Sequence, residues 1–145
     1  LRRQRQMCIR DSAYCVEGDL VAKFGIKICE LETSKVYLFK EQSHPGRCIV
    51  AHKKHVGDMN ELTAEERAAY FEDVARVARA IMAAFHPDKV NYGAYGDTGH
   101  HLHFHLCPKY KDEFEWGGVF LMNPDKKYLS DEEYADMIAK IKANL

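Results

Sequence analysis

Apolar and polar positions along the chain follow two different periods, which predicts a mixture of strands and helices. Four short runs rich in β-branched and aromatic residues predict strands, at 35–40, 47–52, 90–95 and 101–107. Turn-forming residues separate the first two runs at His44-Pro45-Gly46 and the last two at residues 96–99. We therefore expect two antiparallel pairs. Residues 13–34 are weakly patterned and fit either a short helix or edge strands.

A long helix is expected to start at Thr63, because Glu66 three residues later completes a capping box. Apolar residues then recur at steps of three and four, at Phe71, Val74, Ala78, Ile81 and Phe85. Pro87 has no N–H and clashes with the preceding turn, so the helix should end near Phe85.

A second helix is expected at the C-terminal end of the chain, where Ser130 and Glu133 repeat the capping box. Its apolar stripe is formed by Tyr134, Met137 or Ile138, Ile141 and Leu145. Strands followed by a long helix, more strands and a last helix predict an α+β fold with an antiparallel sheet.

Composition narrows the class of protein further. The chain has 145 residues, of which 46% are hydrophobic, enough for the core of one domain. No apolar run approaches the roughly 20 residues that cross a bilayer, so we expect no membrane partner and a cytoplasmic location. The net charge of −1 gives no basic surface field of the kind that long nucleic acid requires.

Residues 1–12 form a basic segment that we set apart from a single domain over 13–145. The segment resembles translated adaptor sequence, and the alternative is a disordered N-terminal arm. Without its four arginines and one aspartate the chain keeps 17 basic against 21 acidic residues, a net charge of −4. The five cysteines, an odd number without a repeated spacing, predict reduced thiols rather than a disulfide framework.

The most informative pattern is a row of histidines. In a strand over 101–107, His101, His103 and His105 point to one face while the alternate apolar residues point to the other. These could be polar residues on a half-exposed sheet, but three at strict alternation suggest chemistry. A neutral imidazole can bind a metal or form bonds to phosphorus, and the spacing alone does not choose between the two.

Residues 101–107, His-Leu-His-Phe-His-Leu-Cys, resemble the signature of the histidine triad (HIT) family, His-φ-His-φ-His-φ-φ with φ apolar. The resemblance covers about residues 34–110. It includes Pro45-Gly46, the run 48–51 and the outlying pair His55-Val56 upstream. Pro108-Lys109 stands where many relatives have Pro-Arg. The resemblance implies a HIT-like antiparallel sheet with one long central helix and a C-terminal helix, and commonly a homodimer.

The resemblance also implies roles for individual residues. The middle histidine of the family attacks the α-phosphorus of a nucleotide, so His103 is expected to be the nucleophile. His105 matches the residue that contacts the phosphate oxygens and can hand a proton to the leaving group, and His101 and His55 complete the catalytic cluster. Asn91 and Thr98 match phosphate-contacting positions, although turn chemistry explains them equally well.

Three departures from the family pattern put nucleotide recognition and metal binding in doubt. Asp97 stands where relatives often have Gln, and Phe39 where some have a ribose-binding Asn or Asp. The N-terminal Cys-x-x-Cys that binds a structural zinc in many relatives is reduced here to Cys15, with Ser12 at the first position. We therefore expect no required cofactor and no metal site at the histidines.

The leading hypothesis is a nucleotide hydrolase that cleaves at the α-phosphate of a dinucleoside polyphosphate or a nucleoside phosphoramidate, a small nucleotide substrate. Related nucleotidyl transferases have Gln at the third position of the triad, so His105 favours hydrolysis. Two alternatives stay open: a zinc-binding module built from the histidines, with His55 or water as fourth ligand, and a nucleotide-binding regulatory protein with little activity.

The remaining histidines are expected to have no part in the site. His44, His52 and His86 are interpreted as turn or surface residues, and His100 as pointing away from the other three. The loop residues Trp116-Gly117-Gly118 either cover the nucleotide or anchor the loop.

Overall fold

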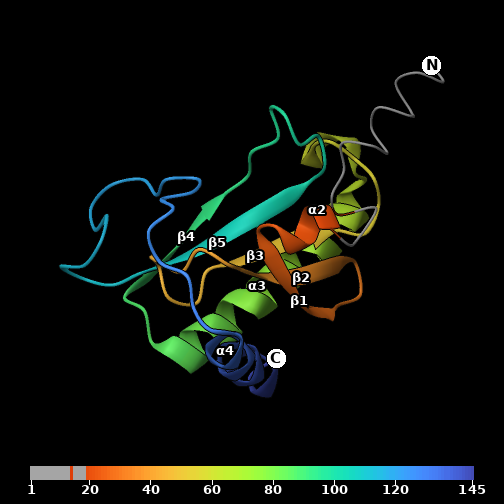
Figure 1. Ribbon diagram of the computed structural model, residues 1–145. Coiled ribbons are helices and arrows are strands. Elements are labelled where there is room, and N and C mark those ends of the chain that lie inside the picture. The colour runs from red at the N-terminus through yellow and green to blue at the C-terminus, as the bar shows by residue number, and fades with distance from the viewer. Residues whose placement is uncertain (1–13, 15–18) are drawn as a thin grey trace.

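The computed structural model describes Tyr14 and residues 19–145 (Figure 1). The predicted N-terminal segment 1–12 and the cysteine at 15 lie outside the described residues.

A five-stranded antiparallel sheet organises the fold, in the order β1-β2-β3-β5-β4. The strands are β1 (Gly25–Glu30), β2 (Ser34–Phe39), β3 (Cys48–His52), β4 (Lys89–Gly93) and β5 (His103–Lys109). Both predicted antiparallel pairs are present, β2 with β3 and β4 with β5, and β3 with β5 joins them. The weakly patterned N-terminal region contains both predicted alternatives, a short helix α2 (Asp19–Ala22) and the edge strand β1.

The sheet strand that carries the histidines starts two residues later than predicted. The His101 N–H donates to the Gly99 carbonyl oxygen at 2.8 Å, and the Leu102 N–H donates to that of Val56 at 2.7 Å. These backbone groups therefore pair with loops rather than with a neighbouring strand, and β5 begins at His103.

The long helix α3 (Ala64–Phe85) has both hydrogen bonds of the predicted capping box at Thr63 and Glu66. It ends where expected, with His86 in the left-handed conformation at φ 53° directly before Pro87. The predicted apolar stripe is wrong for one residue, Phe71, which is 38% exposed at the margin of the core. Its ring contacts the ring of Phe104, with 5.6 Å between the centroids. A short 3₁₀ helix, η1 (Met59–Glu61), precedes α3.

The C-terminal helix α4 (Asp131–Ala143) also shows its predicted capping box, at Ser130 and Glu133. Tyr134 and Ile141 on its apolar stripe are buried. The Tyr134 hydroxyl donates to the Lys40 carbonyl oxygen at 2.7 Å, which ties the start of α4 to the end of β2.

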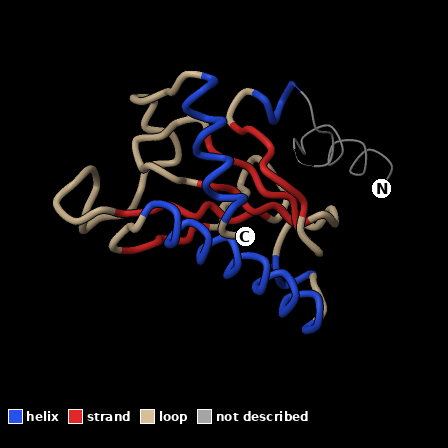
Figure 2. The backbone as a smooth tube through the Cα atoms, turned by 90° about the horizontal axis from the view of Figure 1, so that it is seen from below, coloured by secondary structure: helices blue, strands red, loops and turns tan. Residues whose placement is uncertain are grey.

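The helices α3 and α4 lie together on one face of the sheet, and α2 lies at the other (Figures 1 and 2). The main core, between the sheet and these two helices, includes Leu102, Phe104 and Leu106 as the alternation predicts. A smaller cluster on the opposite face contains Tyr14, Val21, Tyr37, Phe39, Ile49 and Ala51. No helix within the described part of the chain is long and apolar enough to cross a membrane.

Candidate functional site

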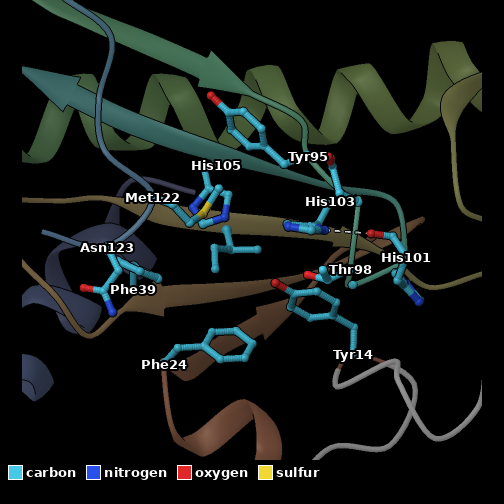
Figure 3. A pocket seen from close by; sticks show the side chains of 14 residues that line it. Tyr14, Phe24, Phe39, Tyr95, Thr98, His101, His103, His105, Met122 and Asn123 are labelled. Atoms are coloured by element: carbon cyan, nitrogen blue, oxygen red, sulfur yellow. Dashed lines mark hydrogen bonds between the residues drawn. The ribbon is translucent and has the colours of Figure 1, made fainter. Parts of the chain in front are cut away.

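The three histidines line a pocket of about 600 Å³ on the face of the sheet opposite α3 (Figure 3). Its walls come from the N-terminal region, the sheet, the β4–β5 loop and the loop before α4. The lining residues are Tyr14, Phe24, Phe39, Ile49, Tyr95, Gly96, Asp97, Thr98, Gly99, His101, His103, His105, Met122 and Asn123. The alternation read from the sequence therefore brings the triad to one face.

His103 is held by the backbone of its own strand. Its Nδ1 lies 2.7 Å from the His101 carbonyl oxygen, drawn as the dashed line in Figure 3. A carbonyl oxygen can only accept, so Nδ1 carries the proton and Nε2 keeps its lone pair. Burial lowers the pKa of His103, which keeps the imidazole neutral near pH 7. The ring is thus oriented and in the protonation state that a nucleophile needs.

His101 is fixed in a similar way and supports its neighbour. Its Nε2 donates to the His52 carbonyl oxygen at 2.6 Å, and its Nδ1 lies 3.3 Å from Nδ1 of His55. Burial lowers the pKa of His101 to about 4. The exposed His55 does not line the pocket, and it contacts His101, which does.

His105 has a charged partner. Nη2 of Arg47, the residue directly before β3, donates to His105 Nδ1 at 3.0 Å. Burial, the Arg47 charge and the neighbouring His103 together hold the pKa of His105 far below its usual range. Arg47 follows Gly46, whose φ of 94° lies in the left-handed region and whose Cβ, if present, would lie 2.6 Å from the Phe85 ring. The Pro-Gly turn therefore sets where this arginine enters the sheet.

Aromatic side chains that the sequence did not point to form much of the wall. The Tyr14 ring lies 4.9 Å from the His103 imidazole and 5.5 Å from that of His101, between centroids. Phe24 packs edge-on against Tyr14 at 5.8 Å. Tyr14 and Phe24 belong to the region without a clear periodicity, so no pattern in the sequence marked them. Phe39 was singled out only as a departure from the family.

The two predicted substrate-contacting residues lie in different places. Thr98 lines the pocket beside Asp97, in the loop between β4 and β5. Asn91 shares the sheet face of the triad but pairs with Cys107, whereas Gly93 is the residue opposite His105. Asn91 lines a separate hollow beside Lys109 and Trp116 rather than the histidine pocket, because the strand carries it past the end of the triad.

Two of the histidines interpreted as turn or surface residues, His44 and His52, are buried. His44 does lie in the predicted turn, where its carbonyl oxygen accepts from the Arg47 N–H at 3.1 Å, but the interpretation is wrong for His52. His44 Nε2 donates to Glu115 Oε1 at 2.7 Å, and burial lowers the pKa of His44. His52 lies within β3, and its Nδ1 accepts from the Lys54 N–H at 2.9 Å. The His44 ring depends on Glu115, and the His52 ring packs against Tyr70 at 5.2 Å between centroids, and no local pattern reveals these tertiary partners. His86 and His100 are exposed as expected, and His100 does not line the triad pocket.

The loop 110–118 is held by hydrogen bonds from Lys109 and does not line the histidine pocket. Lys109 is buried and its Nζ donates to the carbonyl oxygens of Glu115 and Gly118 at 2.6 and 2.8 Å. Trp116 lines the hollow beside Asn91 and not the histidine pocket. Of the two interpretations of Trp116-Gly117-Gly118, the geometry supports the anchor.

Each histidine of the row has one ring nitrogen engaged in a hydrogen bond, Nε2 of His101, Nδ1 of His103 and Nδ1 of His105. Across Tyr14 and residues 19–145, no group of three His, Cys, Asp or Glu side chains could hold a metal ion.

Comparisons with known proteins agree with this geometry. The HIT domain model matches residues 25–112. The chain is 28% identical to Protein hit of Bacillus subtilis over 81% of this chain and 84% of that protein. It is also 28% identical to the adenosine 5'-monophosphoramidase of Schizosaccharomyces pombe, over 70% and 75% of the two chains.

Solved structures show the same architecture. A histidine triad protein from Sinorhizobium meliloti superposes with a TM-score of 0.81 at 23% identity, covering 88% of this chain and 95% of that one. The α+β fold predicted from the sequence, with its long helix and C-terminal helix, is confirmed. The motif, the fold and the match over residues 25–112 lead to one conclusion: the chain belongs to the histidine triad family.

Proposed function

We propose that the protein is a nucleotide hydrolase that cleaves at an α-phosphate through a nucleotidyl intermediate on His103. One observation carries the proposal: the Nδ1–H of His103 is bound to the His101 carbonyl oxygen, which leaves the Nε2 lone pair as the available nucleophile in the pocket. A neutral, oriented imidazole divides one difficult displacement at phosphorus into two easier ones.

In the first step His103 Nε2 attacks the α-phosphorus, a nitrogen–phosphorus bond forms, and the bond to the leaving group breaks. The leaving group departs with the electron pair of that bond and takes up a proton from solvent, so that a phosphoramidate releases an amine. In the second step water adds to phosphorus and gives up a proton to solvent, the bond to His103 breaks, and a nucleoside monophosphate and the free imidazole are released. Thr98, at the edge of the pocket, donates to a phosphoryl oxygen, where neutral donors stabilise spread negative charge.

The charge of the pocket favours a phosphoramidate over a polyphosphate. Among the described lining residues Asp97 is anionic and none is a lysine or arginine; the Arg47 guanidinium lies behind His105, where its Nη2 donates to Nδ1 of that ring. A chain of several phosphates would place extra negative charge near Asp97 without cationic partners to neutralise it. The relative from S. pombe is named a monophosphoramidase, which supports the same choice.

The proposed partner is therefore a small nucleotide, and no metal is required for turnover. Chelator-treated protein should hydrolyse its substrate at the untreated rate, since the proposed steps use side chains only. The homodimer that the family resemblance implies stays a prediction, which sedimentation would check. A measurement of turnover would distinguish a hydrolase from a regulatory protein that binds nucleotide with little activity.

The test is hydrolysis of adenosine and guanosine phosphoramidates and dinucleoside polyphosphates, with products identified by mass. His103→Ala should abolish turnover, and His100→Ala, an exposed neighbour outside the pocket, should leave it intact. After a denaturant quench, a nucleotidyl adduct should map to His103. Near-normal hydrolysis by His103→Ala, or no hydrolysis of any substrate by the parent protein, would overturn the proposal.

A further inference from the structure

Behind the triad lies a buried arginine that the proposed steps do not use. Arg47 is fully buried, and its guanidinium carbon lies 4.2 Å from the centroid of the Phe39 ring and 4.9 Å from that of Phe120. Nη1 donates to the Leu121 carbonyl oxygen at 3.0 Å, and Nη2 donates to the Met122 carbonyl oxygen at 2.9 Å. Its third contact is Nδ1 of His105 at 3.0 Å.

These contacts leave the guanidinium little freedom. Two aromatic rings fix its plane, and two backbone carbonyls fix its rotation, so one N–H is aimed at the imidazole. No carboxylate lies within ion-pairing distance of Arg47 among the described residues. Burying a cation without such a partner costs stability, which points to a role other than holding the fold together.

The direction of the hydrogen bond is set by chemistry. A guanidinium has five donors and no acceptor, and it does not deprotonate in proteins. Nδ1 of His105 must therefore be the acceptor, and the proton of the neutral ring must sit on Nε2.

We propose that Arg47 is a positioning residue that fixes His105 as the neutral Nε2–H tautomer, so that His105 presents a hydrogen-bond donor to the phosphoryl group. The proposal rests on the proposed function for the identity of the group that accepts this bond, but the tautomer itself can be measured without substrate.

The residues around His105 also favour its neutral form. Among the described residues, the titratable groups that contact it are Arg47, directly before β3, His103 from its own strand, and Tyr95 from the β4–β5 loop at 6.4 Å between ring centroids. Phe39 and Phe120 supply the apolar remainder. Burial is the main reason that the pKa of His105 is lowered, and the Arg47 charge adds to it.

This assignment revises what the family resemblance implies for His105. A neutral imidazole that gave up its Nε2 proton would become an imidazolate, so His105 should stabilise negative charge by a hydrogen bond rather than transfer a proton. No bond to His105 forms or breaks in either step of the proposed reaction.

The direct test is nitrogen NMR of the ¹⁵N-histidine-labelled protein between pH 5 and 8. We expect His105, assigned by its loss in His105→Gln, to show an unprotonated Nδ1 and a protonated Nε2 throughout. A protonated Nδ1, or a ring that becomes cationic within this range, would overturn the proposal without any need for a variant of Arg47.

Variants test whether Arg47 is the cause. In Arg47→Met the fixed Nε2–H tautomer of His105 should be lost and its pKa should rise, because the donor to Nδ1 and the neighbouring positive charge are both removed while burial remains. The value of kcat should fall about 10- to 100-fold with little change in KM, as for loss of a group that orients a functional imidazole. Arg47→Lys, which keeps a cationic donor, should retain part of both properties.

Arg67→Met is the matched control, because Arg67 donates to the backbone carbonyls of Met59 and Leu62 away from the pocket. It should change neither the spectrum nor kcat. An unchanged His105 tautomer and titration in folded Arg47→Met would refute the role of Arg47. If Arg47→Met does not fold, the parent spectrum and Arg47→Lys decide. If the parent protein formed no nucleotidyl adduct on His103, that result would count against the proposed function alone.

Discussion

The two faces of β5 share one backbone but depend on different interactions. On the core face, Leu102, Phe104 and Leu106 pack among the apolar residues of α3 and the sheet, where volume and apolarity matter. On the pocket face, the histidines are equally buried, and each ring is held by a directional hydrogen bond to a different partner. Substitutions on one face should therefore change stability, and substitutions on the other should change chemistry.

The largest expected effect is a loss of activity, with little loss of stability, on substitution of the pocket face. His105→Ala removes a donor to the phosphoryl group, and kcat should fall about 10²–10⁴-fold, the range for a positioned polar group in the transition state. The melting temperature should stay close to that of the parent, because the ring lies outside the main core. Steady-state kinetics and circular dichroism check this, and a variant that unfolds would show that the two faces are not separable.

The core face should show the opposite result. Phe104→Ala leaves a cavity beside the rings of Tyr70 and Phe71 and should lower the free energy of unfolding by about 3–5 kcal/mol. Urea titration measures the loss, with the exposed His100→Ala as the control expected to change little. Equal stabilities for Phe104→Ala and the parent would contradict the observed strand register.

The buried histidines should also make stability depend on pH. The pKa of His101 is about 4 in the fold, against about 6.5 in the unfolded chain, so the unfolded state binds more protons between these values. The free energy of unfolding should therefore fall as the pH drops from about 6.5 to 4, by on the order of 1–3 kcal/mol for this residue. Urea titrations of the parent and of His101→Gln measure it, and equal slopes for the two proteins would refute it.

The smallest expected effect distinguishes two residues that the sequence treated alike. Thr98→Ala should lower kcat/KM about tenfold through loss of one hydrogen bond to a charged group, and Thr98→Ser should restore most of it. Asn91→Ala should change kcat/KM less than about twofold, because Asn91 lies outside the pocket. Equal losses in both alanine variants would place the substrate differently from our proposal.

Local signals in the sequence were sufficient for the regular elements. The capping boxes at Thr63 and Ser130 and the stop at Pro87 are formed by neighbouring residues, so both long helices could be located closely. The shared face of His101, His103 and His105 follows from the two-residue period of an extended chain. The resemblance to a family signature then added the expected chemistry.

Several features of the site depended on residues far apart in the chain. His44 is buried because Glu115 reaches it across 71 positions, and the Asn91 side chain misses the pocket because of the register between β4 and β5. Tyr14 enters the wall from a region without periodicity. Such placements follow from packing between residues far apart in the chain, so a local sequence pattern does not reveal them.

The sequence by itself determined the fold class, the two capped helices and the histidine row, because each is encoded by side chains within a few positions of one another. The tertiary structure decided the state of each imidazole. Whether a ring nitrogen holds a proton depends on the partner opposite it, and for His103 and His105 those partners are a backbone carbonyl and the distant Arg47. Only the folded chain brings that guanidinium to 3.0 Å from His105, and that contact sets which nitrogen of His105 can face the substrate as a donor.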